Sequence, residues 1–280
     1  MTQAVLLTGA TGFVGRQVLK AFASRDVNIR LVVREGKPVQ FNQTDKIASV
    51  QTVPDLFSET EAWWKETCEG IDTVVHVAWY AEPGLYLQSP KNLDCLSGTI
   101  ALAKASVAAG VRRFVGVGTC FEYDLSQGYL SIDTPVKPTT PYAAAKAAAF
   151  FSLSQHFAAA NVEFAWCRLF YLYGEGEDGR RLVPYLRTKL SKGEVAQLSS
   201  GSQVRDFMDV QDAGRMIADI ALSKRQGAVN VCSGKGITVR ELAEHIADEY
   251  GRRDLLRFGE RPDNLVDPPC VVGIRAGLDL

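Results

Sequence analysis

The sequence predicts an α/β fold, a doubly wound parallel sheet with a smaller lobe interleaved with it in the C-terminal half. Three observations predict this arrangement. Short apolar runs alternate with longer helical stretches as far as Arg168, which is typical of a parallel sheet covered by helices. A glycine-spaced turn joins the first apolar run to the first helical stretch. After Arg168 the chain enters a loop rich in glycine and charge at residues 174–181.

The elements of the first half follow from this alternation. Apolar runs of five or six residues predict strands, because strands buried on both faces read as continuous apolar segments. The predicted strands are residues 4–8, 29–33, 73–77, 114–118 and 163–168. The predicted helices are residues 14–24, 59–69, 92–109 and 142–160. Right-handed crossovers between parallel strands then place helices on both faces of the sheet.

The second half predicts a smaller lobe that interrupts the sheet domain. Residues 182–192 read as a helix and 193–203 as a loop with a short strand. Sequence patterns typical of a strand and a helix return at 207–221 and 228–231, and a last helix is expected at 239–250. We therefore expect residues 1–168, with 204–234 returning to them, to form the sheet domain. Residues 169–203 and 235–280 should form the second lobe.

Composition excludes several classes of function. The 280 residues are 46% hydrophobic, and 31 Lys and Arg against 32 Asp and Glu leave a net charge of −1, so we expect neither disorder nor nucleic-acid binding. The six scattered cysteines and three histidines show no metal-ligand spacing, so no metal is expected. The absence of an apolar stretch of ~20 residues and of a basic leader predicts a cytoplasmic protein without membrane contact.

The turn after the first predicted strand has the pattern of a dinucleotide-binding loop. Glycines at three-residue spacing allow a tight turn, let amide N–H groups approach a pyrophosphate and place that anion at a helix N-terminus. The candidate contacts are Gly9, Thr11, Gly12, Phe13, Val14 and Gly15. A glycine-rich turn without a ligand is the alternative. The strand–turn–helix context favours the dinucleotide.

The end of the second predicted strand indicates which dinucleotide binds. Enzymes that use NAD place a carboxylate there against the ribose 2′-OH, and enzymes that use NADP place a cation. Val33 occupies the first position and Arg34 follows, which favours NADP(H). Glu35 keeps NAD(H) open, and Arg34 as a solvated charge is the other alternative.

A candidate proton donor stands near the middle of the chain. Tyr142 and Lys146 are four residues apart at the start of an alanine-rich helix and therefore share one face. A nearby ammonium group lowers the pKa of a phenol, which is otherwise about 10. Thr119 follows the fourth predicted strand, at the sheet edge where ligands of open α/β folds bind. A partly buried Tyr beside a surface Lys is the alternative for the isolated pair, but the combination with the glycine turn favours catalysis.

These motifs, in this order, resemble the extended short-chain dehydrogenase/reductase family of nucleotide-sugar epimerases, dehydratases and ketoreductases. The resemblance covers nearly the whole chain and implies a Rossmann-type NAD(P)-binding domain with a substrate-binding lobe. It also implies a homodimer built on the alanine-rich helices. Further cofactor contacts are implied for Asp55, Leu56, Ala78 and Asn92. A role in binding the nucleotide-linked sugar is implied for Arg205, within Arg205-Asp206-Phe207, and for Arg261.

Two departures from the family pattern bear on the reaction. Tyr171 stands where the family has an Asn that binds the substrate, so that interaction is either missing or made by another residue. The 4,6-dehydratases of the family follow the catalytic Thr with an acid pair, whereas this chain has Cys120 and Phe121, which we expect to line the substrate pocket. Glu122 lies one position further on and is a weak substitute. Dehydration is therefore disfavoured.

The other candidate positions carry two interpretations each. Trp79 and Tyr80, just beyond Ala78, either pack the cleft wall or stack on the sugar. Cys120 is either a reactive thiol or a small buried one. Arg168 either faces the sugar-linked diphosphate with Arg205 or makes an internal ion pair.

The favoured activity is NADPH-dependent reduction of a nucleotide-linked 4-keto-6-deoxy sugar. Tyr142 would give its proton to the substrate oxygen, Lys146 would lower the phenol pKa and bind the nicotinamide ribose, and Thr119 would orient the carbonyl. An NAD-dependent nucleotide-sugar 4-epimerase is the first alternative, and a non-catalytic NADP-binding sensor the second. Which nucleotide and which sugar are recognised stays open at this point.

Overall fold

The computed structural model describes residues 2–37, 46–264 and 267–275, and its largest element is a sheet of seven parallel strands. The strand order is β11-β7-β5-β4-β1-β2-β3. The strands are β1 (Gln3–Thr8), β2 (Val27–Arg34), β3 (Ile47–Val53), β4 (Thr73–His76), β5 (Arg113–Thr119), β7 (Glu163–Leu169) and β11 (Gly227–Val231). The five strands predicted in the first half are confirmed, each to within two residues. The sequence analysis missed β3.

The order of the strands reverses beside β1. From β1 the chain builds outward to β2 and β3 on one side, and it then crosses over to β4, β5 and β7 on the other. In open α/β sheets, ligands bind outside the carboxyl ends of the strands at such a switch point. The ends of β1 and β4, at Thr8 and His76, therefore mark the expected cleft.

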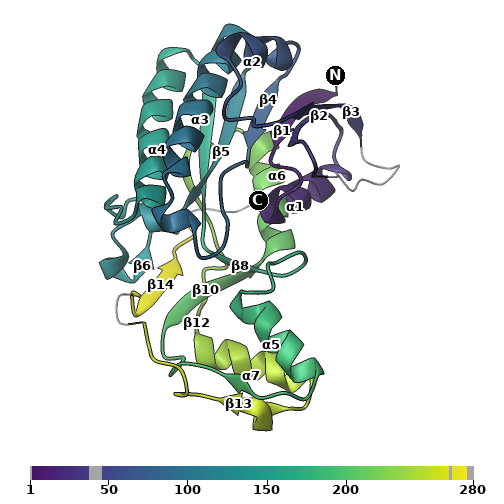
Figure 1. The fold of residues 1–280 in the computed structure, drawn as a ribbon. Coiled ribbons are helices and arrows are strands. Elements are labelled where there is room, and N and C mark those ends of the chain that lie inside the picture. Colours follow the sequence, from purple (N-terminus) through teal and green to yellow (C-terminus); the bar gives the residue numbers. More distant parts are fainter. Residues whose placement is uncertain (1, 38–45, 265–266, 276–280) are drawn as a thin grey trace.

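Helices cover both faces of this sheet (Figure 1). One face packs against α1 and α6, and the other against α2, α3 and α4. Their bounds are α1 (Phe13–Phe22), α2 (Glu61–Cys68), α3 (Lys91–Ala108), α4 (Pro141–Ala159) and α6 (Val210–Leu222). Helix α4 begins where the sequence predicts, because the Thr140 side chain accepts a hydrogen bond from the amide of Ala143 and Pro141 occupies the first turn.

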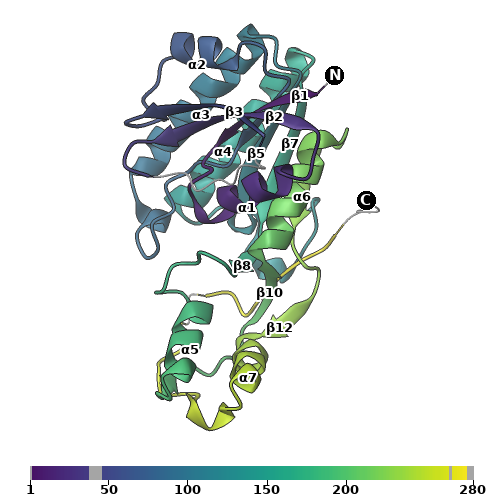
Figure 2. The same ribbon diagram turned by 90° about the vertical axis from the view of Figure 1, so that its right-hand side faces the viewer.

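A second sheet of five short strands lies beyond the carboxyl edge of the first (Figures 1 and 2). Its order is β12-β10-β14-β6, and β8 pairs with β10. The strands are β6 (Tyr129–Leu130), β8 (Tyr171–Tyr173), β10 (Val204–Asp209), β12 (Gly236–Thr238) and β14 (Cys270–Gly273). Below it, α5 and α7 pack on a two-stranded sheet. These elements are α5 (Leu182–Ser191), α7 (Val239–Glu249), β9 (Ala196–Gln197) and β13 (Leu256–Arg257).

The segment 204–234, expected to return to the sheet domain, divides between the two sheets. Strand β10 pairs with β8, β12 and β14 of the small sheet. Helix α6 then packs on the large sheet, and β11 forms its edge beside β7. The division into a cofactor domain and a substrate lobe stays a prediction. What the structure adds is that β10 carries the chain from one sheet to the other.

Candidate active site

The glycine turn after β1 has the geometry that the sequence predicts. Gly9 has a φ of +78°, and a Cβ there would lie 2.6 Å from the backbone nitrogen of Ala78. A Cβ on Gly15 would lie 2.0 Å from the carbonyl oxygen of Gly9. Helix α1 follows with Gly12 as its N-cap and no side-chain cap. The first turn of α1 therefore keeps backbone N–H groups for an anionic ligand.

A cleft of about 830 Å³ runs from this turn along the carboxyl edge of the sheet. It brings together most of the residues predicted from the sequence. At the dinucleotide end it is lined by Gly9, Thr11, Gly12, Phe13, Val14, Gly15, Arg34, Asp55, Leu56 and Ala78. At the other end it is lined by Trp79, Tyr80, Thr119, Cys120, Phe121, Tyr142, Lys146 and Tyr171.

The three candidate catalytic side chains meet at the end of β5. Thr119 is the last residue of that strand, and its side chain lies next to the Tyr142 hydroxyl and opposes the rise in the pKa of that phenol. Lys146 lies one turn further along α4, is 3% exposed, and donates a hydrogen bond from Nζ to the carbonyl oxygen of Val117 at 2.6 Å. The same Nζ lies 3.7 Å from the centre of the Trp79 ring. Trp79 thus packs against the catalytic group.

Burial controls the proton affinities of this group. Desolvation lowers the pKa of Lys146 to about 7, while the nearby Glu122 opposes that shift. Desolvation also raises the pKa of Tyr142 above its usual value, with Tyr86 and Glu122 adding to the rise. That Lys146 lowers the phenol pKa stays a prediction, because burial is the largest influence on Tyr142 here and the ammonium group contacts Val117 and Trp79. The phenol is consequently protonated at neutral pH.

Three predicted ligand residues lie outside the cleft lining. Asn92 is 1% exposed, and its Oδ1 accepts a hydrogen bond from Trp79 Nε1 at 2.9 Å, so it holds the cleft wall. Arg205 is buried and pairs with Asp267 at 2.7 Å. Arg261 lies on the ring of Tyr185 in the small lobe and donates to its hydroxyl at 3.1 Å. None of these three side chains lines the cleft directly, because each is held by a protein partner.

Tyr86, which the sequence analysis missed, packs over Tyr142, and Arg181 lies behind it. The Tyr86 ring lies 4.8 Å from the ring of Tyr142, nearly perpendicular to it. The Tyr86 side chain forms a hydrogen bond with Arg181, the N-cap residue of α5. Next to it, Arg180 pairs with Glu82 at 2.6 Å. The glycine- and charge-rich loop thus reaches from the small lobe to Tyr86, which packs on Tyr142, and the adjacent arginines of the loop are the sequence signal for this contact.

The positions after Thr119 differ in exposure to the cleft. Cys120 and Phe121 line it, and burial raises the pKa of the Cys120 thiol, which stays neutral. Glu122 is fully buried and is absent from the lining. It pairs with Arg168, with 2.7 Å between Oε2 and Nε. The internal ion pair is therefore the correct interpretation of Arg168, and Glu122 does not substitute for the missing acid pair.

Comparison with known proteins identifies the family. The profile of the NAD dependent epimerase/dehydratase family matches residues 5–232, which include the glycine turn, Thr119, Tyr142 and Lys146. The chain belongs to this family. Membership confirms the predicted family, the α/β fold and the class of enzyme.

Individual known proteins align over most of the chain. The dTDP-6-deoxy-L-talose 4-dehydrogenase (NAD(+)) of Aggregatibacter actinomycetemcomitans is 23% identical over 97% of this chain and 99% of its own length. The dTDP-glucose 4,6-dehydratase of Streptomyces griseus is 28% identical over 90% of this chain and 80% of its own. Among solved structures, MoeE5 in complex with UDP-glucuronic acid and NAD superposes with a TM-score of 0.78 at 27% identity, covering 97% and 90%.

Two further findings concern membrane-spanning helices and the cofactor. Within the described ranges 2–37, 46–264 and 267–275, no helix is long and apolar enough to cross a membrane. The structural neighbour named above holds NAD. A nicotinamide dinucleotide is thus the supported class of cofactor, and the choice between NAD and NADP rests on the residues around Arg34.

Proposed function

We propose that this protein reduces the 4-keto group of a nucleotide-linked 4-keto-6-deoxy sugar with NADPH. The observation that carries the proposal is the composition of one cleft. It holds a dinucleotide turn at one end and a proton donor, Tyr142, at the other, while Cys120 and Phe121 replace the acid pair needed for dehydration. The full-length relative named for a 4-dehydrogenase of a 6-deoxy sugar supports redox chemistry at this carbon.

The residues of the cleft fit a dinucleotide. The uncapped first turn of α1 offers backbone N–H groups to the diphosphate, and Asp55, Leu56 and Ala78 line the path from there to the catalytic end. When bound, the nicotinamide supplies the hydride. Packing of Gly9 against Ala78 leaves no room for a larger residue, so the turn stays close to the end of β4.

The protein's own residues handle the proton. Tyr142, protonated at neutral pH, donates to the substrate oxygen, and the neighbouring Thr119 orients that oxygen from the end of β5. Lys146, with a pKa near 7, stabilises the phenolate that forms and takes part in returning the proton from solvent. The ring of Tyr86 covers Tyr142 and keeps water away from the donor.

Substrate recognition is proposed to involve residues of the small lobe. Arg181 lines the cleft and is exposed, so it is the arginine available to an anionic diphosphate, whereas Arg205 is paired with Asp267. The Tyr171 hydroxyl is buried and has no hydrogen-bond partner within the described residues. A buried unpaired hydroxyl is costly, and a substrate oxygen would satisfy it. Tyr171 is thus proposed to bind the substrate in place of the family's Asn.

The NADP preference is proposed on the residues after β2. Arg34 and Lys37 line the cleft, whereas Glu35 is absent from its lining. Replacing Arg34 with Ala should weaken NADP binding roughly 10–100-fold and leave NAD binding nearly unchanged, because only NADP carries the 2′-phosphate. Glu35→Ala is the matched control and should affect neither dinucleotide. Fluorescence titration of both cofactors measures these constants. Unchanged NADP affinity in the Arg34 variant, together with weaker NAD binding in the Glu35 variant, would establish NAD(H) as the cofactor.

The cofactor content of the purified protein tests reductase against epimerase. A 4-epimerase returns the hydride to its own intermediate and therefore keeps NAD bound, whereas a reductase exchanges its cofactor in every cycle. Protein prepared without added cofactor should release little dinucleotide on denaturation, measured by mass spectrometry. Release of about one NAD per chain would contradict the proposal and favour the epimerase.

We also propose that two copies of the chain pair through α3 and α4. These helices pack together on one face of the large sheet (Figure 1), and each presents a large apolar side chain to solvent. Leu93 on α3 is 65% exposed and Phe151 on α4 is 55% exposed. Burying them against a second copy removes apolar surface from water on both chains.

A further inference from the structure

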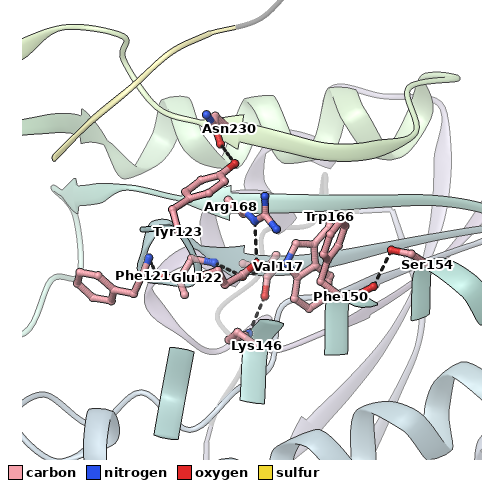
Figure 3. A network of polar contacts seen from close by, with 11 residues as sticks. Val117, Phe121, Glu122, Tyr123, Lys146, Phe150, Ser154, Trp166, Arg168 and Asn230 are labelled. Atoms are coloured by element: carbon pink, nitrogen blue, oxygen red, sulfur yellow. Dashed lines mark hydrogen bonds and ion pairs between the residues drawn. The ribbon is translucent and has the colours of Figure 1, made fainter. Parts of the chain in front are cut away.

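Glu122 is a fully buried carboxylate immediately behind the catalytic group, and four hydrogen bonds fix it (Figure 3). Its Oε1 accepts from the backbone nitrogen of Thr119 at 2.8 Å and from Trp166 Nε1 at 3.0 Å. Its Oε2 accepts from Arg168 Nε at 2.7 Å and from the same indole at 3.2 Å. Both oxygens are occupied by donors from the protein, and the carboxylate does not line the cleft.

The end of β5 is held from two sides by charged groups. Lys146 Nζ donates to the carbonyl oxygen of Val117, and Glu122 accepts from the amide of Thr119 two residues later. Between them, a Cβ on Gly118 would lie 2.2 Å from Trp166 Nε1 and 2.4 Å from Glu122 Oε1. Glycine at this position thus lets the indole and the carboxylate contact the strand. The backbone that presents the Thr119 hydroxyl is fixed by these contacts.

The carboxylate also acts on Lys146, because its negative charge raises the pKa of the ammonium group. The titratable groups around Lys146 are His76 on β4, Cys95 on α3, Glu122, and Tyr142 one turn earlier on α4. Desolvation lowers the pKa of His76 to about 3 and raises the pKa of Cys95 to about 11, so both are neutral at pH 7. Tyr142 is protonated there as well. Of these four groups around Lys146, Glu122 is therefore the one that carries a negative charge.

We propose that Glu122 is a positioning residue, which anchors the backbone of Thr119 and supplies the counter-charge for the buried Lys146 ammonium group. Arg168 balances the carboxylate on its far side, between the rings of Tyr123 and Phe150 at 4.3 and 4.6 Å. The effect on turnover rests on the proposed reductase function. The effect on Lys146 does not, because it is a property of the folded protein without substrate.

Two variants separate the hydrogen bond to the Thr119 backbone from the negative charge beside Lys146. Glu122→Asp keeps the ion pair with Arg168 but shortens the side chain, so the Thr119 amide loses its partner. Glu122→Gln combined with Arg168→Met removes both charges, keeps an oxygen for Thr119 and avoids an unpaired buried arginine. The control is Glu163→Gln combined with Arg113→Met, which removes another ion pair, 2.8 Å long, at the amino ends of β7 and β5, in which Arg113 is buried and Glu163 is partly exposed.

The titration of Lys146 is read from the ¹³Cε chemical shift of ¹³C-lysine-labelled protein, with the resonance assigned by Lys146→Arg. We expect Lys146 to titrate about one pH unit lower in the Gln/Met variant than in the wild type, because a favourable charge is lost, and at the wild-type position in the Glu163/Arg113 control. We expect Glu122→Asp to lower kcat on the order of 10-fold or more with KM nearly unchanged, because a displaced Thr119 misorients the bound carbonyl.

The outcomes are distinguishable from failure of the proposed function. If no 4-keto sugar is reduced by the wild type, the Lys146 titration still decides the counter-charge. If the Gln/Met variant does not fold, Glu122→Asp, which retains the ion pair, decides the anchor. An unchanged Lys146 pKa in the folded Gln/Met variant would show that Glu122 is not the counter-charge. A wild-type kcat in Glu122→Asp would show that Glu122 does not anchor Thr119.

Discussion

Replacing Tyr142 with Phe should lower kcat by about 10²–10⁴-fold, because the variant has no proton to give to the substrate oxygen. Fold and cofactor affinity should stay at wild-type levels, since the ring still packs between Tyr86 and Trp79. The rate is followed as NADPH oxidation in the presence of a nucleotide-linked 4-keto-6-deoxy sugar. Cofactor affinity is measured separately by titration.

The control for this prediction is Tyr129→Phe. Tyr129 lies on β6, is 59% exposed and is absent from the cleft lining, so the loss of its hydroxyl should leave the rate within about twofold of wild type. If Tyr142→Phe reduced the substrate at more than a third of the wild-type rate, another group would have to be the proton donor. A full biological effect of this variant without turnover would instead favour the sensor.

Gly15→Ala should abolish dinucleotide binding and destabilise the protein. Its Cβ would lie 2.0 Å from the carbonyl oxygen and 2.6 Å from the carbonyl carbon of Gly9, so the turn or helix α1 must move. Overpacking of this kind costs about 1–3 kcal/mol of unfolding free energy, and more where backbone must shift. We expect the cofactor Kd to rise by at least about 100-fold, because the amides that meet the diphosphate move with the helix.

Gly179→Ala is the matched control, since a Cβ there has no neighbour within 4 Å and the residue does not have a positive φ. Its unfolding free energy should change by less than about 0.5 kcal/mol. Urea unfolding and cofactor titration measure both variants. Wild-type cofactor affinity in Gly15→Ala would show that the turn does not hold the dinucleotide.

The parts of the fold that the sequence predicts are those with local signals. Strand β5 is buried along its whole length and reads as one apolar run, and the start of α4 is marked by Thr140 and Pro141. Strand β3 was missed because it is an edge strand, largely exposed, whose apolar residues Ile47, Val50 and Val53 show no alternation. The small sheet was missed because its strands are short and pair across the sequence, as β6 does with β14.

The site residues also divide into those with a local sequence signal and those without one. The glycines, Thr119, Tyr142 and Lys146 meet in one cleft, as expected from motifs tied to strand and helix ends. The contacts of side chains predicted by residue type alone, such as Arg205, could not be predicted, because a charged group pairs with an opposite charge that the fold brings close. Asp267 for Arg205 and Glu122 for Arg168 come from 62 and 46 residues away. No spacing in the sequence signals such pairs.

The most direct test of the proposed reductase is isotope transfer. The protein is incubated with a nucleotide-linked 4-keto-6-deoxy sugar and NADPH that carries deuterium at nicotinamide C4, in separate reactions with each of the two deuterated faces. We predict that one NADPH is consumed per sugar reduced, and that one face delivers one deuterium to C4 of the product. Product or isomer formed without net NADPH consumption and without deuterium at C4 would contradict the account.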